Sequence, residues 1–139
     1  MAAIRSGNTK PELFVRRSLH AAGFRFRLHA KDLPGKPDIV LPRYRAVVFV
    51  HGCFWHQHDC HLFKWPSTRK DFWAQKISRN AGNDKLALAA LLEQGWRVAI
   101  VWECALKGRH RLEPDAAMRE LVRWVGSEQS TLDIRGKSG

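Results

Sequence analysis

The sequence predicts an α/β fold in which a mixed β-sheet is flanked by helices. Its apolar runs are short and rich in β-branched residues, which is typical of strands in a sheet that is covered on both faces. These runs lie at residues 38–41, 45–50 and 96–102. Segments with helical periodicity lie at residues 9–22, 70–94 and 114–125. Packing helices against a central sheet is the simplest way to bury such parts.

The first helix and the first strand have recognisable boundaries. Thr9 suits an N-cap, Pro11 suits the first helical turn, and Gly23 favours a helix end just before it. The following residues, Phe24–His29, alternate between apolar and basic side chains, as a half-buried strand does. Leu33–Pro37 contains two prolines and a glycine and therefore predicts a turn.

The second half of the chain continues with a long helix. This helix is expected over residues 70–94, and Gly95 ends it before the last apolar strand. Residues 103–111 are expected to form a loop. The final helix, at residues 114–125, is amphipathic. The predicted order is therefore α-β-β-β-loop-α-β-α.

Length and composition indicate one soluble domain. The 139 residues include 45% apolar residues, which suffices for one core. We expect a single domain over residues 1–126 and a flexible C-terminal tail over residues 127–139, because that tail is polar.

The charge of the chain points to a polyanionic partner. The formal net charge is +11 at pH 7, and nucleic acid is the first candidate, with an anionic membrane surface as the alternative. No apolar run approaches the roughly 18 residues of a membrane span, and the first residues contain no apolar core of a secretion signal. We therefore expect an intracellular, cytoplasmic protein that acts as a monomer, with its three cysteines reduced.

The segment His51–His61 predicts a structural zinc site. It contains two of the three cysteines and four histidines, and Cys104 follows the last apolar strand. Cysteines and a histidine around a tetrahedral centre are a common structural zinc set. The expected ligands are Cys53, His58, Cys60 and Cys104. His56 and His61 compete with His58, and buried free thiols beside a solvated loop are the alternative.

Asp38 is the first candidate for catalysis. It lies where a turn leads into a strand, and many nucleases hold Mg²⁺ with an Asp there and an acid-x-Lys sequence on the next strand. The corresponding sequence here is Phe49-Val50-His51, so the second acid and the lysine are missing. The backbone carbonyl of Val50 can replace the missing carboxylate oxygen. The alternative is that Asp38 is an ordinary turn residue.

Two further carboxylates are candidates. Asp84 lies in an apolar helical stripe, where a carboxylate needs a partner, and it can orient a catalytic histidine. A salt bridge to an Arg or Lys is the alternative. Glu12 stands in the first turn of the first helix, where it can be simply a capping acid. The apolar stripe comprises Ile77, Ala81, Leu88 and Leu91.

Aromatic residues near cationic ones indicate contact with DNA bases. Phe54 and Trp55 lie inside the zinc segment, where a metal-bound loop leaves little room to bury both. Trp73 follows among several Lys and Arg residues. Such residues suit stacking on bases or wedging into a duplex, and wedging costs less at a mismatch.

Taken together, these motifs resemble the very-short-patch-repair (Vsr) mismatch endonucleases. The most specific matches are Val48–His56, with the sequence VFVHGCFWH, and Val101–Leu106, with the sequence VWECAL. Leu33–Asp38 and Phe72-Trp73 match as well. The resemblance extends from Met1 to about Val125.

This resemblance implies a restriction-endonuclease-like fold and a Mg²⁺-dependent endonuclease with a structural Zn²⁺ ion. The implied substrate is double-stranded DNA with a T:G mismatch left by deamination of 5-methylcytosine. The implied reaction is a nick on the 5′ side of the mispaired T, which initiates very short patch repair. The product ends are a 5′-phosphate and a 3′-hydroxyl.

The resemblance also assigns roles to residues of this chain. Asp38 and the Val50 carbonyl correspond to the Mg²⁺ ligands, and the zinc set is again Cys53, His58, Cys60 and Cys104. The catalytic group comprises Asp38, His51, His56, Asp84 and Glu12. The residues implied in DNA binding are Phe54, Trp55, Trp73, Lys76 and Asn80.

Two other functions remain open from sequence. One is a related restriction or defence nuclease that needs no mismatch, since the chemistry is shared. The other is a zinc-dependent DNA-binding module without catalysis, which the missing acid-x-Lys sequence favours. The sequence does not identify the histidine that acts as the base.

Overall fold

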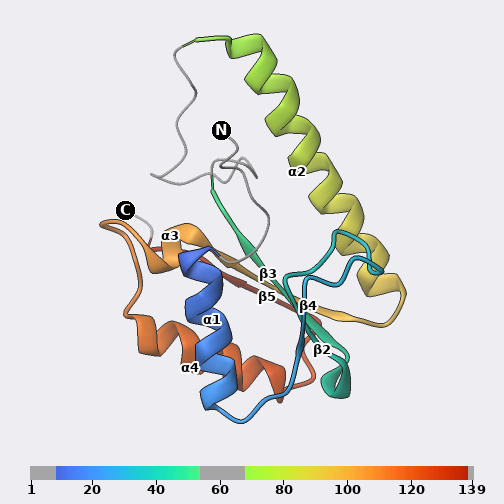
Figure 1. Cartoon of the computed structure of the whole chain (residues 1–139), viewed down its shortest axis with the longest axis vertical. Helices are drawn as coiled ribbons and strands as arrows, with labels where there is room; N and C mark the ends of the chain where they lie inside the picture. The colour runs from blue at the N-terminus through green and yellow to red at the C-terminus, as the bar shows by residue number, and fades with distance from the viewer. Residues whose placement is uncertain (1–8, 54–67, 138–139) are drawn as a thin grey trace.

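The computed structural model describes residues 9–53 and 68–137 (Figure 1). The helices are α1 (Lys10–Ala21), η1 (Pro42–Tyr44, a 3₁₀ turn), α2 (Lys70–Glu93), α3 (Glu103–Leu106) and α4 (Pro114–Val125). The strands are β1 (Arg27–Leu28), β2 (Ile39–Leu41), β3 (Ala46–His51), β4 (Arg97–Trp102) and β5 (Thr131–Ile134). Phe54, Trp55, His56, His58 and Cys60 lie outside the described residues. None of the helices in the described part is long and apolar enough to span a membrane.

The strands form one mixed sheet in the order β1-β2-β3-β4-β5. The pairs β1–β2 and β2–β3 are antiparallel, whereas β3–β4 and β4–β5 are parallel. The long helix α2 lies between β3 and β4 in the chain and makes the crossover that a parallel pair requires. The predicted mixed sheet flanked by helices is confirmed.

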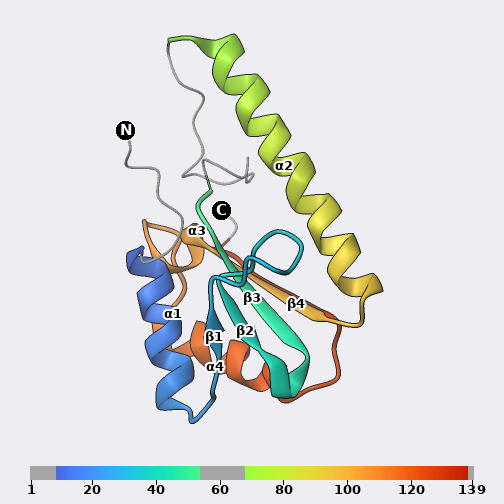
Figure 2. The ribbon, with the colours of Figure 1, turned by 45° about the vertical axis from the view of Figure 1, so that its right-hand side comes forward.

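One face of the sheet packs against α1 and α4. Val15 and Leu19 of α1 and Leu121 and Trp124 of α4 meet alternate strand residues, among them Val48. Both helices lie side by side on this face in the two views (Figures 1 and 2). This layer contains the larger buried cluster, and it fixes α1 beside β2 and β3.

The other face packs against the C-terminal part of α2. Val47 and Phe49 of β3 and Val98 of β4 point to this face and join Leu91 of α2. The N-terminal half of α2 extends beyond the sheet in both views (Figures 1 and 2). Because strand neighbours alternate between the two faces, β3 and β4 are covered on both sides, as their apolar composition predicts.

The helix boundaries follow from capping residues. Thr9 Oγ1 accepts a hydrogen bond from Glu12 N at 3.3 Å, which confirms it as the N-cap of α1. The side chain of Glu113 accepts hydrogen bonds from the first turn of α4 in the same way. Gly23 and Gly95 follow α1 and α2 with φ of 94° and 89°, a left-handed conformation that favours glycine.

The first strand is shorter than the predicted strand at Phe24–His29. Only Arg27 and Leu28 belong to β1 and pair with β2, which ends at Leu41 because Pro42 begins the 3₁₀ turn η1 and has no N–H to donate. The predicted loop at residues 103–111 likewise begins with a helical turn, α3.

The C-terminal segment corrects the prediction of a flexible tail over residues 127–139. Residues 131–134 form β5, which adds an edge strand to β4, and Ile134 is only 2% exposed. Beyond β5, Lys137 N donates to the carbonyl of His110 at 2.7 Å. This segment was missed because a four-residue strand with polar neighbours has too little periodicity to recognise.

Candidate active site

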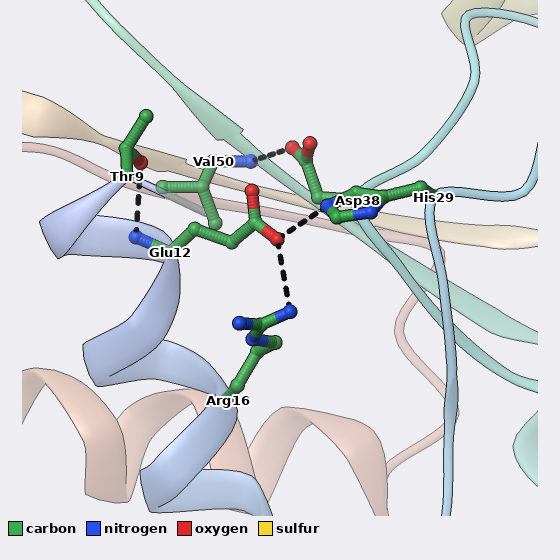
Figure 3. Close-up of polar contacts among 6 residues, drawn as sticks. All are labelled: Thr9, Glu12, Arg16, His29, Asp38 and Val50. Carbon is green, nitrogen blue, oxygen red and sulfur yellow. Dashed lines mark hydrogen bonds and ion pairs between the residues drawn. The ribbon is translucent and has the colours of Figure 1, made fainter. Parts of the chain in front are cut away.

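The candidate active site lies where α1, β1, β2 and β3 meet (Figure 3). Glu12 belongs to the first turn of α1, His29 directly follows β1, and Asp38 directly precedes β2. Val50 lies near the end of β3. Figure 3 shows the side chains of Glu12, His29 and Asp38 directed toward one another.

Glu12 is a buried carboxylate with cationic or polar partners. Its side chain is 2% exposed, and its Oε2 lies 2.6 Å from His29 Nε2 and 3.6 Å from Arg16 Nη1. Because burial without partners would be costly for a carboxylate, these contacts account for its position inside the protein. The cap of α1 is made by Thr9, so Glu12 is directed toward the site and is more than a capping acid.

Asp38 is joined to the neighbouring strand. Its Oδ2 accepts a hydrogen bond from the backbone N–H of Val50 at 2.7 Å. The residue therefore links the start of β2 to the end of β3, and the predicted roles of Asp38 and the Val50 carbonyl as Mg²⁺ ligands stay predictions. This hydrogen bond fixes the carboxylate of Asp38 beside the end of β3.

Glu12, His29 and Asp38 together form a group with metal-ligand chemistry. One potential ligand atom from each residue lies within 4.8 Å of the other two. Two carboxylate oxygens and an imidazole nitrogen are suitable ligands for a divalent cation. His29 was not predicted from the sequence. The only sequence signal was a histidine at the end of an alternating segment, and its partners become visible only through strand pairing.

His51 lies at the end of β3 on the face covered by α2. It is 6% exposed, and its ring centroid lies 5.3 Å from that of Phe49 and 5.1 Å from that of Trp102. These aromatic neighbours restrict the ring orientation. Asp84 is half-buried on α2, which covers the same face of the sheet. The predicted support of a histidine by Asp84 stays a prediction, and His56 lies outside the described residues.

Two of the four predicted zinc ligands lie in the described part of the chain, shortly after the ends of β3 and β4. His51 and Trp102 are partners across the parallel pair β3–β4, and Cys53 and Cys104 each follow two residues later. Both cysteines are buried, with exposures of 0% and 1%. The N–H of Cys53 also donates to Glu103 Oε1 at 3.3 Å. This pair of thiols suits a metal with sulfur ligands.

The predicted DNA-contacting residues of the described part lie on α2. Trp73 and Asn80 are half-buried, and Lys76 is exposed. Phe72 is 44% exposed, packs edge-on against Trp73 at 5.2 Å, and lies beneath the guanidinium of Arg69 at 4.3 Å. The N-terminal part of α2 therefore presents aromatic and cationic groups together.

Fold and site define the class of protein. A mixed sheet that brings two carboxylates together where a strand and a helix begin, in a chain of net charge +11, is consistent with an enzyme that acts on a polyanion such as DNA.

Comparison with known proteins identifies the family within this class. The family model described as DNA mismatch endonuclease Vsr matches residues 1–62. The chain is 45% identical over 134 residues to the DNA mismatch endonuclease Vsr of Escherichia coli, which covers 96% of this chain and 86% of that protein. It is 54% identical over 122 residues to the type II nicking enzyme V.XorIIP of Xanthomonas oryzae, which covers 88% of each chain.

A third relative is also described as a type II nicking enzyme. The type II nicking enzyme V.NmeAIP of Neisseria meningitidis is 46% identical over 109 residues, which covers 78% of each chain. The chain belongs to the Vsr family of endonucleases and is therefore a hydrolase of phosphodiester bonds. This confirms the resemblance seen in the sequence, and it excludes the binding module without catalysis.

Proposed function

We propose that this endonuclease nicks duplex DNA on the 5′ side of the T in a T:G mismatch left by deamination of 5-methylcytosine, and so initiates very short patch repair. The observation that carries the proposal is the convergence of Glu12, His29 and Asp38 beside Val50. The name of the Escherichia coli relative supports the mismatch as substrate. On this proposal the enzyme acts as a monomer on DNA in the bacterial cytoplasm.

The residues of the site fit a catalytic Mg²⁺ ion. Asp38 supplies a carboxylate, and Glu12 adds a second one from α1. The N–H and C=O of one strand residue point to the same side of the strand. The carbonyl of Val50 therefore faces the edge on which its N–H meets Asp38, which supports it as a third oxygen ligand. When bound, Mg²⁺ supplies positive charge to the scissile phosphate and helps to generate the nucleophile.

The protein side chains then position the reactants. Glu12 and Asp38 would hold the cation, which would supply positive charge at the scissile phosphate. A histidine, either His51 or His56, accepts the proton of the attacking water, and Asp84 orients that histidine. Water oxygen forms the new bond to phosphorus, and the bond between phosphorus and the 3′ oxygen breaks. The products are a 5′-phosphate and a 3′-hydroxyl, whose oxygen takes up a proton.

A structural Zn²⁺ ion is part of the same proposal. The burial of Cys53 and Cys104, and their positions two residues beyond the paired strand ends His51 and Trp102, support them as two ligands, and His58 and Cys60 complete the set. Four protein ligands leave no open position, so this ion stabilises the fold and takes no part in catalysis.

The zinc assignment predicts the effect of Cys104→Ser. We expect the bound zinc to fall from about one ion per chain to nearly none, because a hydroxyl is a poor ligand for this ion. Elemental analysis of the purified protein measures this content. A strong chelator should lower the melting temperature of the wild-type protein, and added zinc should restore it. Full zinc content in the variant would contradict the assignment.

Recognition of the mismatch is assigned to aromatic and polar side chains. Phe54, Trp55 and Trp73 wedge into the duplex beside the mismatch, where unstacking costs least. Lys76 and Asn80 face the mismatched pair from α2. The exposed Phe72 and its contact with Arg69 support α2 as a surface that meets DNA.

A related nuclease without a mismatch requirement is the second candidate. Several relatives are described as type II nicking enzymes, and that description does not mention a mismatch. The chemistry would be unchanged, so only the substrate distinguishes the two functions.

The decisive test compares end-labelled duplexes in the presence of Mg²⁺. One duplex contains a single T:G mismatch within a cytosine-methylation site, and the other is fully paired. We expect a nick 5′ of the T in the mismatched duplex only. Asp38→Ala should reduce its rate by at least about a thousandfold, since several kcal/mol of charge stabilisation are lost. Asp32→Ala, an exposed acid in the preceding turn, is the matched control.

The other outcomes are equally informative. Equal cutting of both duplexes would retain the catalytic residues and favour the second candidate. A nick that persists in Asp38→Ala would refute the assignment of Asp38.

A further inference from the structure

His29 occupies a place that the proposed mechanism does not yet use. Its imidazole lies with Glu12 and Asp38 in the one group of potential metal ligands found among residues 9–53 and 68–137. Its side chain is 34% exposed, whereas that of Glu12 is 2% exposed. The imidazole therefore lies on the solvent side of the buried carboxylate, where a cation from solution would enter.

The backbone places this imidazole through several constraints. Leu28 pairs with Ile39, so His29 is opposite Asp38, and its N–H donates to the carbonyl of Asp38 at 2.9 Å. The next residue, Ala30, donates to the carbonyl of Pro37 at 3.1 Å. His29 adopts a left-handed conformation with φ of 50°, which is costly for a residue other than glycine. The backbone hydrogen bonds of His29 and Ala30 hold His29 in this conformation, and its side chain is directed toward Glu12 of α1.

We propose that His29 is a direct ligand of the cation held by Glu12 and Asp38, and that it shifts the preference of the site from Mg²⁺ toward first-row transition ions such as Mn²⁺. This inference rests on the metal site of the proposed function. Metal–ligand bonds of about 2.1 Å place ligand atoms within about 4 Å of one another. The observed limit of 4.8 Å requires only small side-chain adjustments.

The chemistry of the nitrogen decides the preference. Mg²⁺ favours oxygen ligands and water, whereas imidazole binds transition ions more strongly. When Nε2 binds the ion, the neutral ring carries its proton on Nδ1, so the present hydrogen bond between Nε2 and Glu12 is exchanged for two bonds to the same ion. Mg²⁺ can still occupy the site through the carboxylates, so nicking with either ion is expected.

The alternative role for His29 is to position Glu12 by the 2.6 Å hydrogen bond alone. The variant His29→Gln separates the two roles, because a glutamine amide can donate to Glu12 but offers no imidazole nitrogen. His20→Gln is the matched control, since His20 is exposed in the last turn of the same helix that carries Glu12.

The experiment uses the full chain with its zinc retained and Mn²⁺ alone as the probe. Electron paramagnetic resonance gives the Mn²⁺ affinity, and pulsed measurements detect ¹⁴N coupling from a bound imidazole. The wild type and His20→Gln should show this coupling, and His29→Gln should lose it. The Mn²⁺ dissociation constant should rise about tenfold or more in His29→Gln, at least the effect of losing an outer-shell partner. The Mg²⁺ constant, measured by competition, should change much less.

The variant Asp38→Ala separates failure of this inference from failure of the proposed metal site. If Mn²⁺ binding depends on Asp38 but the ¹⁴N coupling persists in His29→Gln, or is absent from the wild type, His29 is not a ligand and only this inference fails. If Mn²⁺ binding is absent or is independent of Asp38, both fail. Circular dichroism of each variant verifies that it is folded.

Discussion

At the scale of single residues, Arg97 shows how one cation can join three elements. Its guanidinium donates to the carbonyls of Tyr44, Trp124, Val125 and Gln129, with Nη1–O distances of 3.2 and 3.1 Å to Tyr44 and Val125. It also lies 4.5 Å from the centroid of the Trp124 ring. Burial lowers the pKa of Arg97 from its ordinary value. Four accepting carbonyls compensate for this loss of solvent.

This arrangement predicts that Arg97→Lys destabilises the protein. A lysine ammonium cannot reach four carbonyls that are arranged around a planar guanidinium, and it stacks less well on Trp124. We expect the free energy of unfolding to fall by about 2 kcal/mol, measured by urea denaturation. Arg119→Lys, at an exposed position on α4, is the control and should change stability by under about 0.5 kcal/mol. Equal stability of both variants would contradict the role of Arg97.

A residue of the candidate site can be predicted from the sequence where the residues next to it mark its place at the end of a strand or helix. Asp38 follows a proline-containing turn and precedes an apolar run, and in the structure its carboxylate accepts a hydrogen bond from the N–H of Val50. The sequence pattern alone identified Glu12 as an acid in a first turn, and only the family resemblance placed it in the catalytic group. Its burial depends on contact with His29, which is 17 residues distant in the chain.

At the scale of elements, the C-terminal strand β5 adds a buried side chain to the core and leads to a contact with Cys104. It pairs with Val98–Val101 of β4, and its Ile134 is buried in the core cluster that the sheet forms with α1 and α4. Gly136 then passes close to α3, where its N–H donates to Cys104 Sγ at 3.3 Å. A β-carbon at Gly136 would lie only 2.6 Å from the carbonyl oxygen of Cys104. The segment after β5 therefore helps to hold Cys104, one of the proposed zinc ligands, in place.

Removal of the buried side chain in β5 tests this contribution. Ile134→Ala should lower the free energy of unfolding by about 2–4 kcal/mol, because a cavity is left in the larger core cluster. Thr131→Ala, an exposed position on the same strand, should have little effect. Chemical denaturation of both variants provides the comparison. A negligible effect of Ile134→Ala would indicate that β5 contributes little to folding.

At the scale of the whole molecule, charge and layering define how DNA can approach. The chain has a net charge of +11, and α2 covers one face of the sheet while α1 and α4 cover the other (Figure 2). The aromatic and cationic residues at the start of α2 lie on the half of this helix that extends beyond the sheet (Figure 2). Neutralised phosphates release counterions, so binding through this half of α2 depends on salt concentration.

The salt dependence of binding provides a quantitative test. The logarithm of the affinity for duplex DNA should fall linearly with the logarithm of salt concentration. If Lys76 contacts a phosphate, Lys76→Ala should reduce the slope by about 0.9. Arg119→Ala, on α4, should leave the slope unchanged. Fluorescence anisotropy over a range of salt concentrations measures both slopes, and identical slopes for Lys76→Ala and the wild type would exclude a phosphate contact.

The sequence by itself determined the fold class, the three longest helices, the central strands and the family. These features depend on local capping, periodicity and contiguous motifs, which a linear sequence displays directly. The same local signals predict the roles of Asp38, Cys53 and Cys104, which stay predictions. Only the tertiary structure decided that β5 completes the sheet and that His29 joins Glu12 and Asp38. Both depend on pairing between distant segments, and the energy of such pairing is a property of the packed chain.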